Sequence, residues 1–294
     1  MSRRTHKQTG PKVIDAHGHV KWLGYDADRL VANMDQHGID VMWLLSWEAP
    51  RHEIDLHYDS VFWPGRVGLP FDDVVDAARA HPGRFVPFYA PDPRHPDSMA
   101  RFRGAVEHLG VRGCGELKCR VMMDDPHALA LFHFCGEKGL PVIFHMDVPL
   151  PRWKIEQPGY WYCCDWENLG RALERCPKTV FVGHAPGFWR EISGDADASA
   201  DSYPKGPVTP GGKLWAFMDR YPHLYCDLSA GSALNALSRD PAAGARFLRR
   251  YEDRCLFGRD CFDDAMHRFI RSCRLPASAA KKIMGGNALR LVPV

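Results

Sequence analysis

The 294-residue sequence lacks any run of about 20 apolar residues, the length that a membrane-spanning helix requires. Its first ten residues are polar and basic, without the apolar centre of a secretion signal. Net charge is small, +2 at pH 7, and runs of like charge are absent, so neither nucleic acid nor an acidic membrane is indicated as a partner. We therefore expect a cytoplasmic protein whose partner is a small molecule.

Glycine-rich and paired-cysteine motifs are also missing. No GxGxxG follows the first apolar run, which argues against an open dinucleotide-binding sheet. The 10 cysteines are scattered without a CxxC pair, and the adjacent Cys163 and Cys164 are too close for an ordinary disulfide. A disulfide scaffold and a cysteine zinc site are thus not favoured, and we expect most cysteines to be reduced and buried.

The most informative residues present are histidines at the ends of apolar runs. His17 and His19 lie two residues apart in a DAHGH motif, and in an extended strand this spacing puts both side chains on one face. Three later apolar runs end in His145, His184 and Asp260. Imidazole and carboxylate groups at several strand ends predict one metal centre assembled from separate strands of a sheet.

Apolar runs alternate with helical patterns along the whole chain. Strands are predicted near 12–17, 41–46, 85–90, 110–118, 142–145, 179–184, 224–227 and 254–258. Helices are predicted near 26–37, 71–80, 97–108, 126–138, 165–175, 212–220, 241–251 and 277–284, with Gly285, Gly286 and Asn287 ending the last one. Eight such units predict an α/β fold, a (β/α)8 TIM barrel with its reactive groups at the C-terminal ends of the strands. We expect residues 12–294 to form this one domain after a poorly ordered tail, 1–11.

The motifs resemble the metal-dependent amidohydrolase superfamily, specifically the amidohydrolase-related branch that includes aminocarboxymuconate-semialdehyde and resorcylate decarboxylases. They read, in order, IDAHGH, GLPVIFH, FVGHAPGFW, YCDLSAG, CLFGRDC and KIMGGNALRLV. The resemblance implies a distorted barrel whose metal is bound by His17, His19, His145 and Asp260. It also implies that His184 binds a second metal or polarises the substrate.

The predicted fourth strand differs from that of two-metal members, which often carry a carboxylated lysine there. It reads CGELK, and strand alternation puts Glu116 and Lys118 on the same face. We expect one divalent metal with Glu116 as an additional ligand. Zinc is the expected metal and manganese the alternative, because both accept imidazole and carboxylate ligands.

The expected chemistry uses the metal and two of these side chains. A bound divalent metal lowers the pKa of its water to about 7, Asp260 can move the water proton, and His184 can stabilise a developing oxyanion. A substrate carboxylate and its surroundings would be contacted by basic and aromatic residues, many of them in two long loops. These candidates are Lys118, Arg152, Trp153, Trp161, Trp189 and Arg190.

Three functions remain open at this point. The leading hypothesis is a metal-dependent hydrolase of the amidohydrolase type that cleaves an amide, ester or lactone in a small carboxylate-bearing molecule. The second is a metal-dependent, non-oxidative decarboxylase or hydratase of an aromatic or unsaturated acid. The third is an inactive barrel that serves as a binding protein. A homo-oligomer is compatible with the sequence, although no residue requires one.

Overall fold

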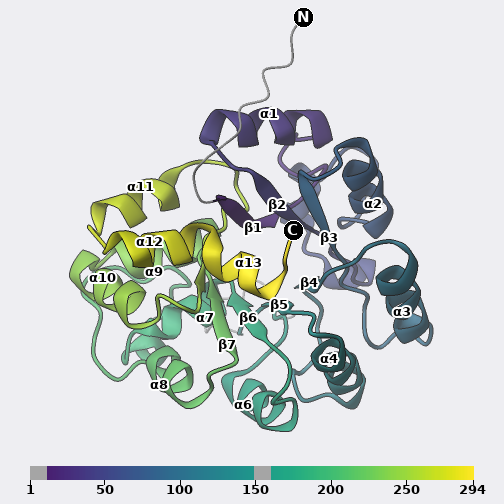
Figure 1. The fold of residues 1–294 in the computed structure, drawn as a ribbon. Coiled ribbons are helices and arrows are strands. Elements are labelled where there is room, and N and C mark those ends of the chain that lie inside the picture. The colour runs from purple at the N-terminus through teal and green to yellow at the C-terminus, as the bar shows by residue number, and fades with distance from the viewer. Residues whose placement is uncertain (1–11, 149–159) are drawn as a thin grey trace, which may run out of the picture.

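Parallel strands at the centre and helices around them make up the structure, a computed structural model that describes residues 12–148 and 160–294 (Figure 1). The tail predicted for residues 1–11 lies outside the described residues. The strands are β1 (Ile14–Gly18), β2 (Val41–Leu45), β3 (Phe85–Phe88), β4 (Cys114–Leu117), β5 (Val142–His145), β6 (Phe181–His184), β7 (Leu224–Asp227) and β8 (Cys255–Leu256). All eight lie where the sequence predicts them, although β4 and β8 are shorter than expected.

The strands form two parallel sheets, ordered β1-β2-β3 and β4-β5-β6-β7-β8. A few backbone hydrogen bonds join the sheets into a ring. Tyr89 N, just after β3, donates to Gly113 O over 3.1 Å, and Ala16 N of β1 donates to Phe257 O over 2.8 Å. The predicted distorted (β/α)8 barrel is therefore confirmed, and its distortion lies at the two seams between the sheets.

Helices cover the outer face of the strands (Figure 1). Those predicted from the sequence are α1 (Ala27–His37), α2 (Phe71–Ala80), α3 (Ser98–His108), α4 (Pro126–Lys138), α6 (Trp166–Arg175), α8 (Lys213–Arg220), α10 (Pro241–Arg250) and α12 (Ala277–Lys281). In residues 12–148 and 160–294, four more were not predicted: α7 (Pro186–Trp189), α9 (Ala230–Ser238), α11 (Ala265–Ser272) and α13 (Asn287–Leu291). None of the helices in the described ranges is long and apolar enough to cross a bilayer.

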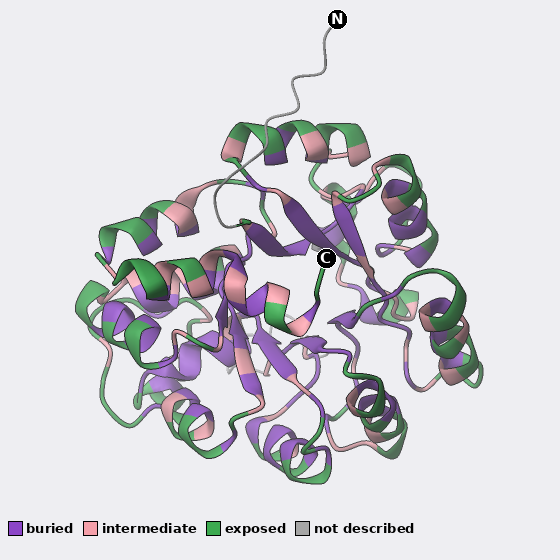
Figure 2. Ribbon diagram, in the orientation of Figure 1, coloured by how far each residue is buried: buried purple, intermediate pink, exposed green. Residues whose placement is uncertain are grey.

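The barrel interior is an apolar core, seen as the buried centre of Figure 2. Trp43, Phe88 and Ile143 are fully buried there, and α13 adds Ala288 while Val292 follows it into the same cluster. The helix lies across the middle of the ring in Figure 1. Since apolar side chains fill the interior at this end, polar chemistry is confined to the opposite end of the strands.

The end of the chain differs from the prediction. Gly285, Gly286 and Asn287 do not stop a helix, because a π-helical turn (Lys282–Gly286) continues directly into α13. A Cβ atom on Gly285 would lie 2.1 Å from the carbonyl oxygen of Lys12. This glycine therefore allows close packing against Lys12, two residues before β1, which is why the helix cap predicted from its type is wrong.

A buried ion pair ties the segment after β8 to β1. Arg259 Nε donates to Asp15 Oδ2 over 2.7 Å, and one of its terminal nitrogens donates to Asn33 Oδ1 over 2.7 Å. Arg259 and Asp15 are 4% and 0% exposed. Because removing one partner leaves the other charge buried and unpaired, this pair is more important to stability than a surface pair.

An Arg259→Met protein is expected to lose about 3–5 kcal/mol of unfolding free energy, the usual cost of breaking a buried pair. Arg268→Met is the matched control, since Arg268 pairs with Asp264 at the surface, where a pair contributes about 0–1 kcal/mol. Urea unfolding of both variants measures the difference. Equal midpoints for the two proteins would show that the pair at Asp15 does not hold the barrel seam.

Candidate metal centre

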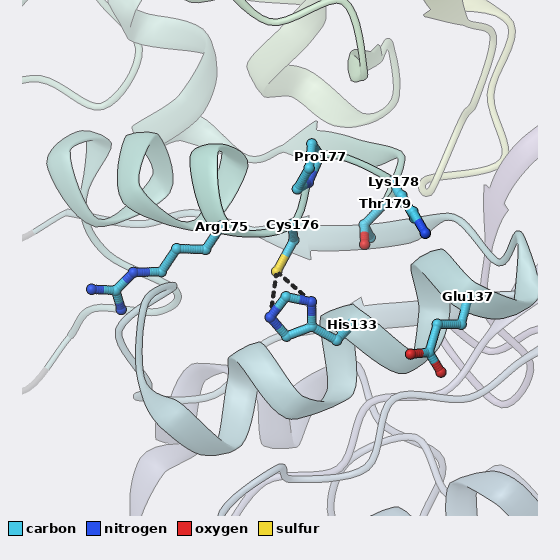
Figure 3. Close-up of a pocket in the computed structure, with 7 residues that line it drawn as sticks. All are labelled: His133, Glu137, Arg175, Cys176, Pro177, Lys178 and Thr179. Carbon is cyan, nitrogen blue, oxygen red and sulfur yellow. Dashed lines mark hydrogen bonds between the residues drawn. The ribbon is translucent and has the colours of Figure 1, made fainter.

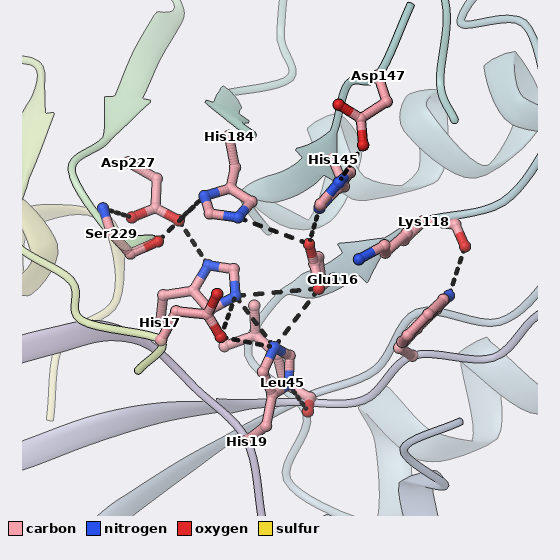
Figure 4. A network of polar contacts seen from close by, with 12 residues as sticks. His17, His19, Leu45, Glu116, Lys118, His145, Asp147, His184, Asp227 and Ser229 are labelled. Atoms are coloured by element: carbon pink, nitrogen blue, oxygen red, sulfur yellow. Dashed lines mark hydrogen bonds and ion pairs between the residues drawn. The ribbon is translucent and has the colours of Figure 1, made fainter. Parts of the chain in front are cut away.

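Polar side chains meet at the carboxyl ends of the strands, as the sequence predicts (Figure 4). They come from β1, β4, β5 and β6 and from the turn after β8. The nitrogen and carboxylate oxygen atoms fall into three overlapping groups, each with its atoms within 4.8 Å of one another. The groups are His17, His184 and Asp260; His17, His19 and Glu116; and Glu116, His145 and His184.

The DAHGH histidines present two nitrogen atoms to one point. His17 Nε2 and His19 Nε2 are 3.1 Å apart. His19 Nδ1 donates to Leu45 O over 2.9 Å, and a carbonyl only accepts, so the Nε2 lone pair of a neutral His19 faces the centre. Two nitrogens on one tetrahedral zinc are roughly 3.3 Å apart, given zinc–nitrogen bonds of about 2.0–2.1 Å. The spacing therefore fits a shared metal.

Asp227, at the end of β7, orients two of the histidines. Its Oδ2 lies 2.5 Å from His17 Nδ1 and 3.3 Å from His184 Nδ1, and its Oδ1 accepts from Ser229 N over 2.9 Å. Ser229 Oγ is also 3.0 Å from His184 Nδ1. With Nδ1 engaged in both rings, Nε2 of each is left to face the centre, the arrangement typical of metal-bound histidine.

The charges in this cluster shift one another. Burial alone would lower the pKa of His17, but the carboxylates of Asp227, Asp260 and Glu116 raise it to about 10. Burial alone would raise the pKa of Asp227, but His17 and His184 hold it well below its usual range. Burial and the charge of His17 lower the pKa of His184, so His184 is neutral at pH 7.

Glu116 lies at the centre of the cluster. Its Oε2 is 3.4 Å from His19 Nε2 and 3.9 Å from His17 Nε2, whereas Oε1 is 2.5 Å from His145 Nδ1 and 3.8 Å from His184 Nε2. Each oxygen thus faces a different pair of histidines. A carboxylate so placed can add a ligand to one metal or bridge two.

Lys118 does not serve as the carboxylated lysine of two-metal members. Burial alone would lower its pKa, but the larger combined effect of Tyr58, Glu116 and Tyr162 raises the pKa above its usual value. A lysine must lose its proton before it can be carboxylated. Of these two side chains, only Glu116 falls within the groups of candidate metal ligands.

Asp260 contributes a free carboxylate oxygen. Its Oδ1 is buried without a hydrogen-bond partner among the described residues, 3.7 Å from His19 Nε2 and 4.0 Å from His17 Nε2. Its backbone N donates to His17 O over 3.0 Å, which fixes the turn against β1. An unpartnered carboxylate oxygen beside two imidazole nitrogens fits a divalent cation, and it also fits a group that moves a proton.

The sequence prediction missed Asp147. Its Oδ2 lies 2.8 Å from His145 Nε2, and the side chain is buried. If Asp147 accepts the Nε2 proton, His145 Nδ1 is left to face Glu116 and a metal. Asp147 stands two residues after His145, the same spacing as in DAHGH, and this could have identified it.

The substrate-binding candidates have different positions. Trp189 is fully buried and donates from Nε1 to Asp227 O over 2.9 Å. Arg190 is also buried, and one terminal nitrogen donates to the carbonyls of Ala196 and Ser199. These contacts assign both side chains to the scaffold beneath the site rather than to a substrate wall. The sequence could not show this, because loop side chains are directed by packing.

The other candidates lie elsewhere. Trp161 is partly exposed beside Tyr162, and Arg152 and Trp153 lie outside the described residues. Aromatic rings border the histidines: Trp22 is 5.9 Å from His19 and Tyr162 is 5.8 Å from His145, measured between ring centroids. Sequence reasoning did not assign Trp22 or Tyr162 to the site.

A surface cavity of about 260 Å³ lies at the other end of β6 (Figure 3). His133, Cys176 and Thr179 line it, with Cys176 Sγ 3.8 Å from the His133 ring nitrogens. Burial raises the pKa of the Cys176 thiol to about 11, so it is not a thiolate at pH 7. The cavity contains none of the clustered strand-end residues and is not the candidate site.

Comparison with known proteins adds to this geometry. The profile of the family described as amidohydrolase matches residues 14–294. The chain belongs to the amidohydrolase family. The comparison with curated proteins finds no match.

Solved amidohydrolase-like structures share the fold. An uncharacterised TIM-barrel protein from Bordetella bronchiseptica has 18% identity and a TM-score of 0.64, with 95% of this chain and 98% of that chain covered. A dihydroxybenzoic acid decarboxylase from Polaromonas, with bound manganese and the inhibitor 2-nitroresorcinol, has 18% identity and a TM-score of 0.59, covering 96% and 97%. A probable 2-pyrone-4,6-dicarboxylic acid hydrolase from Acinetobacter baumannii has 13% identity and a TM-score of 0.58, covering 95% and 98%.

Decarboxylases recur among these matches, and bound zinc is recorded for an amidohydrolase from Burkholderia multivorans. At such low identities the likeness shows the fold alone. Manganese and zinc thus both occur in structures that share this barrel.

Proposed function

We propose that this member of the amidohydrolase family is a metal-dependent decarboxylase of a small aromatic or unsaturated acid, acting without an oxidant. The observation that carries the proposal is the aromatic border of the site, where Trp22 packs on His19 and Tyr162 packs on His145. Flat rings beside the metal-facing histidines suit a flat substrate. The decarboxylases among the matched structures, which act on benzoic acids, support the same substrate class.

The metal would be held by His17, His19, Asp260 and Glu116. His145, the other ligand expected from the sequence, groups instead with Glu116 and His184. When bound, it supplies positive charge that orients an oxygen of the substrate. The features that fit a divalent metal are the unpartnered Oδ1 of Asp260 and the inward-facing nitrogens of the histidines. We propose a single metal, zinc or manganese.

The reaction requires one proton at carbon. The bond between the substrate carbon and its carboxylate breaks, CO2 leaves, and the electron pair stays on that carbon. A proton carried by Asp260 passes to that carbon and is replaced by a proton from the solvent, so the acid anion and one proton give the product and CO2. His184 is neutral and held by Asp227 and Ser229 through Nδ1, so its inward Nε2 lone pair would accept a hydrogen bond from a hydroxyl group of the substrate.

Hydrolysis, the leading expectation from the sequence, is the second candidate. The free Oδ1 of Asp260 favours it, because the same carboxylate can take a proton from an attacking water and return it to the leaving group. The matched pyrone dicarboxylic acid hydrolase supports the corresponding lactone substrate.

One experiment separates the two reactions. Metal-reconstituted protein is incubated anaerobically with 2,6-dihydroxybenzoate and, separately, with 2-pyrone-4,6-dicarboxylate, while CO2 and ring opening are followed. We expect CO2 release from the benzoate without oxygen. Ring opening of the pyrone with no CO2 from either acid would replace decarboxylation by hydrolysis. Boiled protein and metal-free protein serve as controls.

A further inference from the structure

Lys118 carries a buried positive charge beside the candidate metal centre. Its side chain is 5% exposed, and it follows directly on β4. The ammonium nitrogen lies 4.3 Å from the ring centroids of both Trp47 and Tyr58 and 5.6 Å from that of Tyr162. We call these three rings and Lys118 the lysine cage.

The cage does not neutralise the charge. Within the described residues Lys118 forms no ion pair with a carboxylate, and its one hydrogen-bond acceptor is Tyr58 Oη at 2.9 Å. An ammonium group has three N–H donors, so the described residues leave two without an acceptor. Cation–π contacts contribute about 0.5–2 kcal/mol each and do not satisfy those donors.

The side chain of Lys118 is directed toward the candidate metal centre (Figure 4). In Figure 4 the ammonium end of Lys118 points toward Glu116. The rings of the cage continue into the aromatic border of the histidines, because Tyr58 lies 6.1 Å from Trp22, and Tyr162 packs on His145. An anionic group reaching the two free donors would therefore belong to a molecule that also lies against the metal-facing side chains.

The charge on that anionic group must persist through the reaction. The carboxylate that leaves as CO2 loses its charge, so binding it to a fixed cation would stabilise the starting state more than the transition state and slow the reaction. Lys118 therefore suits a second anionic group, one that the reaction does not remove.

We propose that the lysine cage is a subsite for a second carboxylate of a flat substrate, which makes the substrate class a planar dicarboxylate. This rests on the proposed function for the reacting carboxylate, whereas the cage geometry stands independently of which bond is broken. Lys118 is a specificity residue in this proposal, and Trp47 and Tyr58 hold its ammonium group in place.

Binding of matched probes tests the subsite. Isophthalate and terephthalate are compared with their monoamides, which have the same shape but one negative charge fewer, by calorimetry on metal-reconstituted protein. We expect at least one dicarboxylate to bind about tenfold to a hundredfold more tightly than its monoamide, as for a hydrogen bond to a charged group. In Lys118→Met this preference is expected to disappear.

The control is Lys138→Met, which removes an exposed lysine whose ammonium lies 5.9 Å from the Phe134 ring on α4, far from the strand ends. It should keep the wild-type preference. Lys118→Gln, with a polar end group, is the second variant should Lys118→Met fail to fold, and it should lose the preference as well.

Equal binding of both dicarboxylates and their monoamides by the wild-type protein overturns the proposal without any variant, as does an unchanged preference in Lys118→Met. Metal content and CO2 release are measured on the same samples. If the wild-type protein binds no metal or releases no CO2 but still prefers the dicarboxylate, the result counts against the proposed function and not against the subsite.

Discussion

Replacing Asp260 by asparagine is expected to lower kcat for CO2 release by about 10²–10⁴-fold, the usual contribution of a positioned acid or base. Asparagine has nearly the same shape as aspartate but carries no proton that it can give to carbon. The backbone bond from residue 260 to His17 O does not involve the side chain, so the turn is expected to persist. Initial rates at saturating metal measure the loss.

Asp263→Asn is the matched control. Asp263 is an exposed carboxylate three residues away whose Oδ1 accepts from Ala265 N, a bond that asparagine can also accept. Its kcat should equal that of the wild type. If Asp260→Asn retains bound metal and works within about tenfold of the wild type, Asp260 is not the proton donor. Metal analysis of the same sample is essential, because a weaker ligand at this position also lowers occupancy.

The central strands could be predicted from the sequence because they are short apolar runs, several of which end in a polar residue. His145 and His184 illustrate this: both end a run of buried residues, and both lie at the same edge of the barrel. Strand alternation placed His17 and His19 on one face, and parallel order brought the strand ends together. These arguments need no knowledge of tertiary packing.

Elements fixed by tertiary contacts were missed. The Gly285–Gly286 pair carries local signals for the end of a helix, but close packing on Lys12 O determines its conformation. In the site, too, the residues missed from the sequence are those placed by tertiary contacts. Asp147 orients His145 from beyond the end of β5. The cage around Lys118 combines Trp47 after β2, Tyr58 in a 3-10 turn (Leu56–Ser60) and Tyr162 before α6.

Three of the four clustered histidines show why the types of ligand were easier to predict than their surroundings. Each ring has one nitrogen directed inward because the other contacts an acceptor, and each acceptor differs: Asp227 for His17, Leu45 O for His19 and Asp147 for His145. One of these is a backbone carbonyl, for which no sequence signal exists. Ligand type follows from the sequence, but ligand orientation follows from the fold.

The second large effect concerns the metal itself. Purified wild-type protein is expected to hold about one divalent metal per chain. The double variant His17→Ala, His19→Ala is expected to hold none, because it loses two imidazole nitrogens that are 3.1 Å apart. Elemental analysis after reconstitution with zinc or manganese measures this. A metal that binds only the folded chain also stabilises it, so adding metal should raise the Tm of the wild type and not that of the variant.

The double variant His52→Ala, His108→Ala is the control for the number of histidines removed, since both side chains are largely exposed, at 79% and 76%. It should keep full metal content. Two metals per wild-type chain would instead make Glu116 a bridge, since its two oxygens face different histidine pairs. In that case the His17→Ala, His19→Ala protein should keep one metal at His145 and His184, and Glu116→Gln should lower the occupancy of both metal sites. No metal in the wild type after reconstitution would exclude the proposed chemistry and leave the dicarboxylate subsite as a binding function.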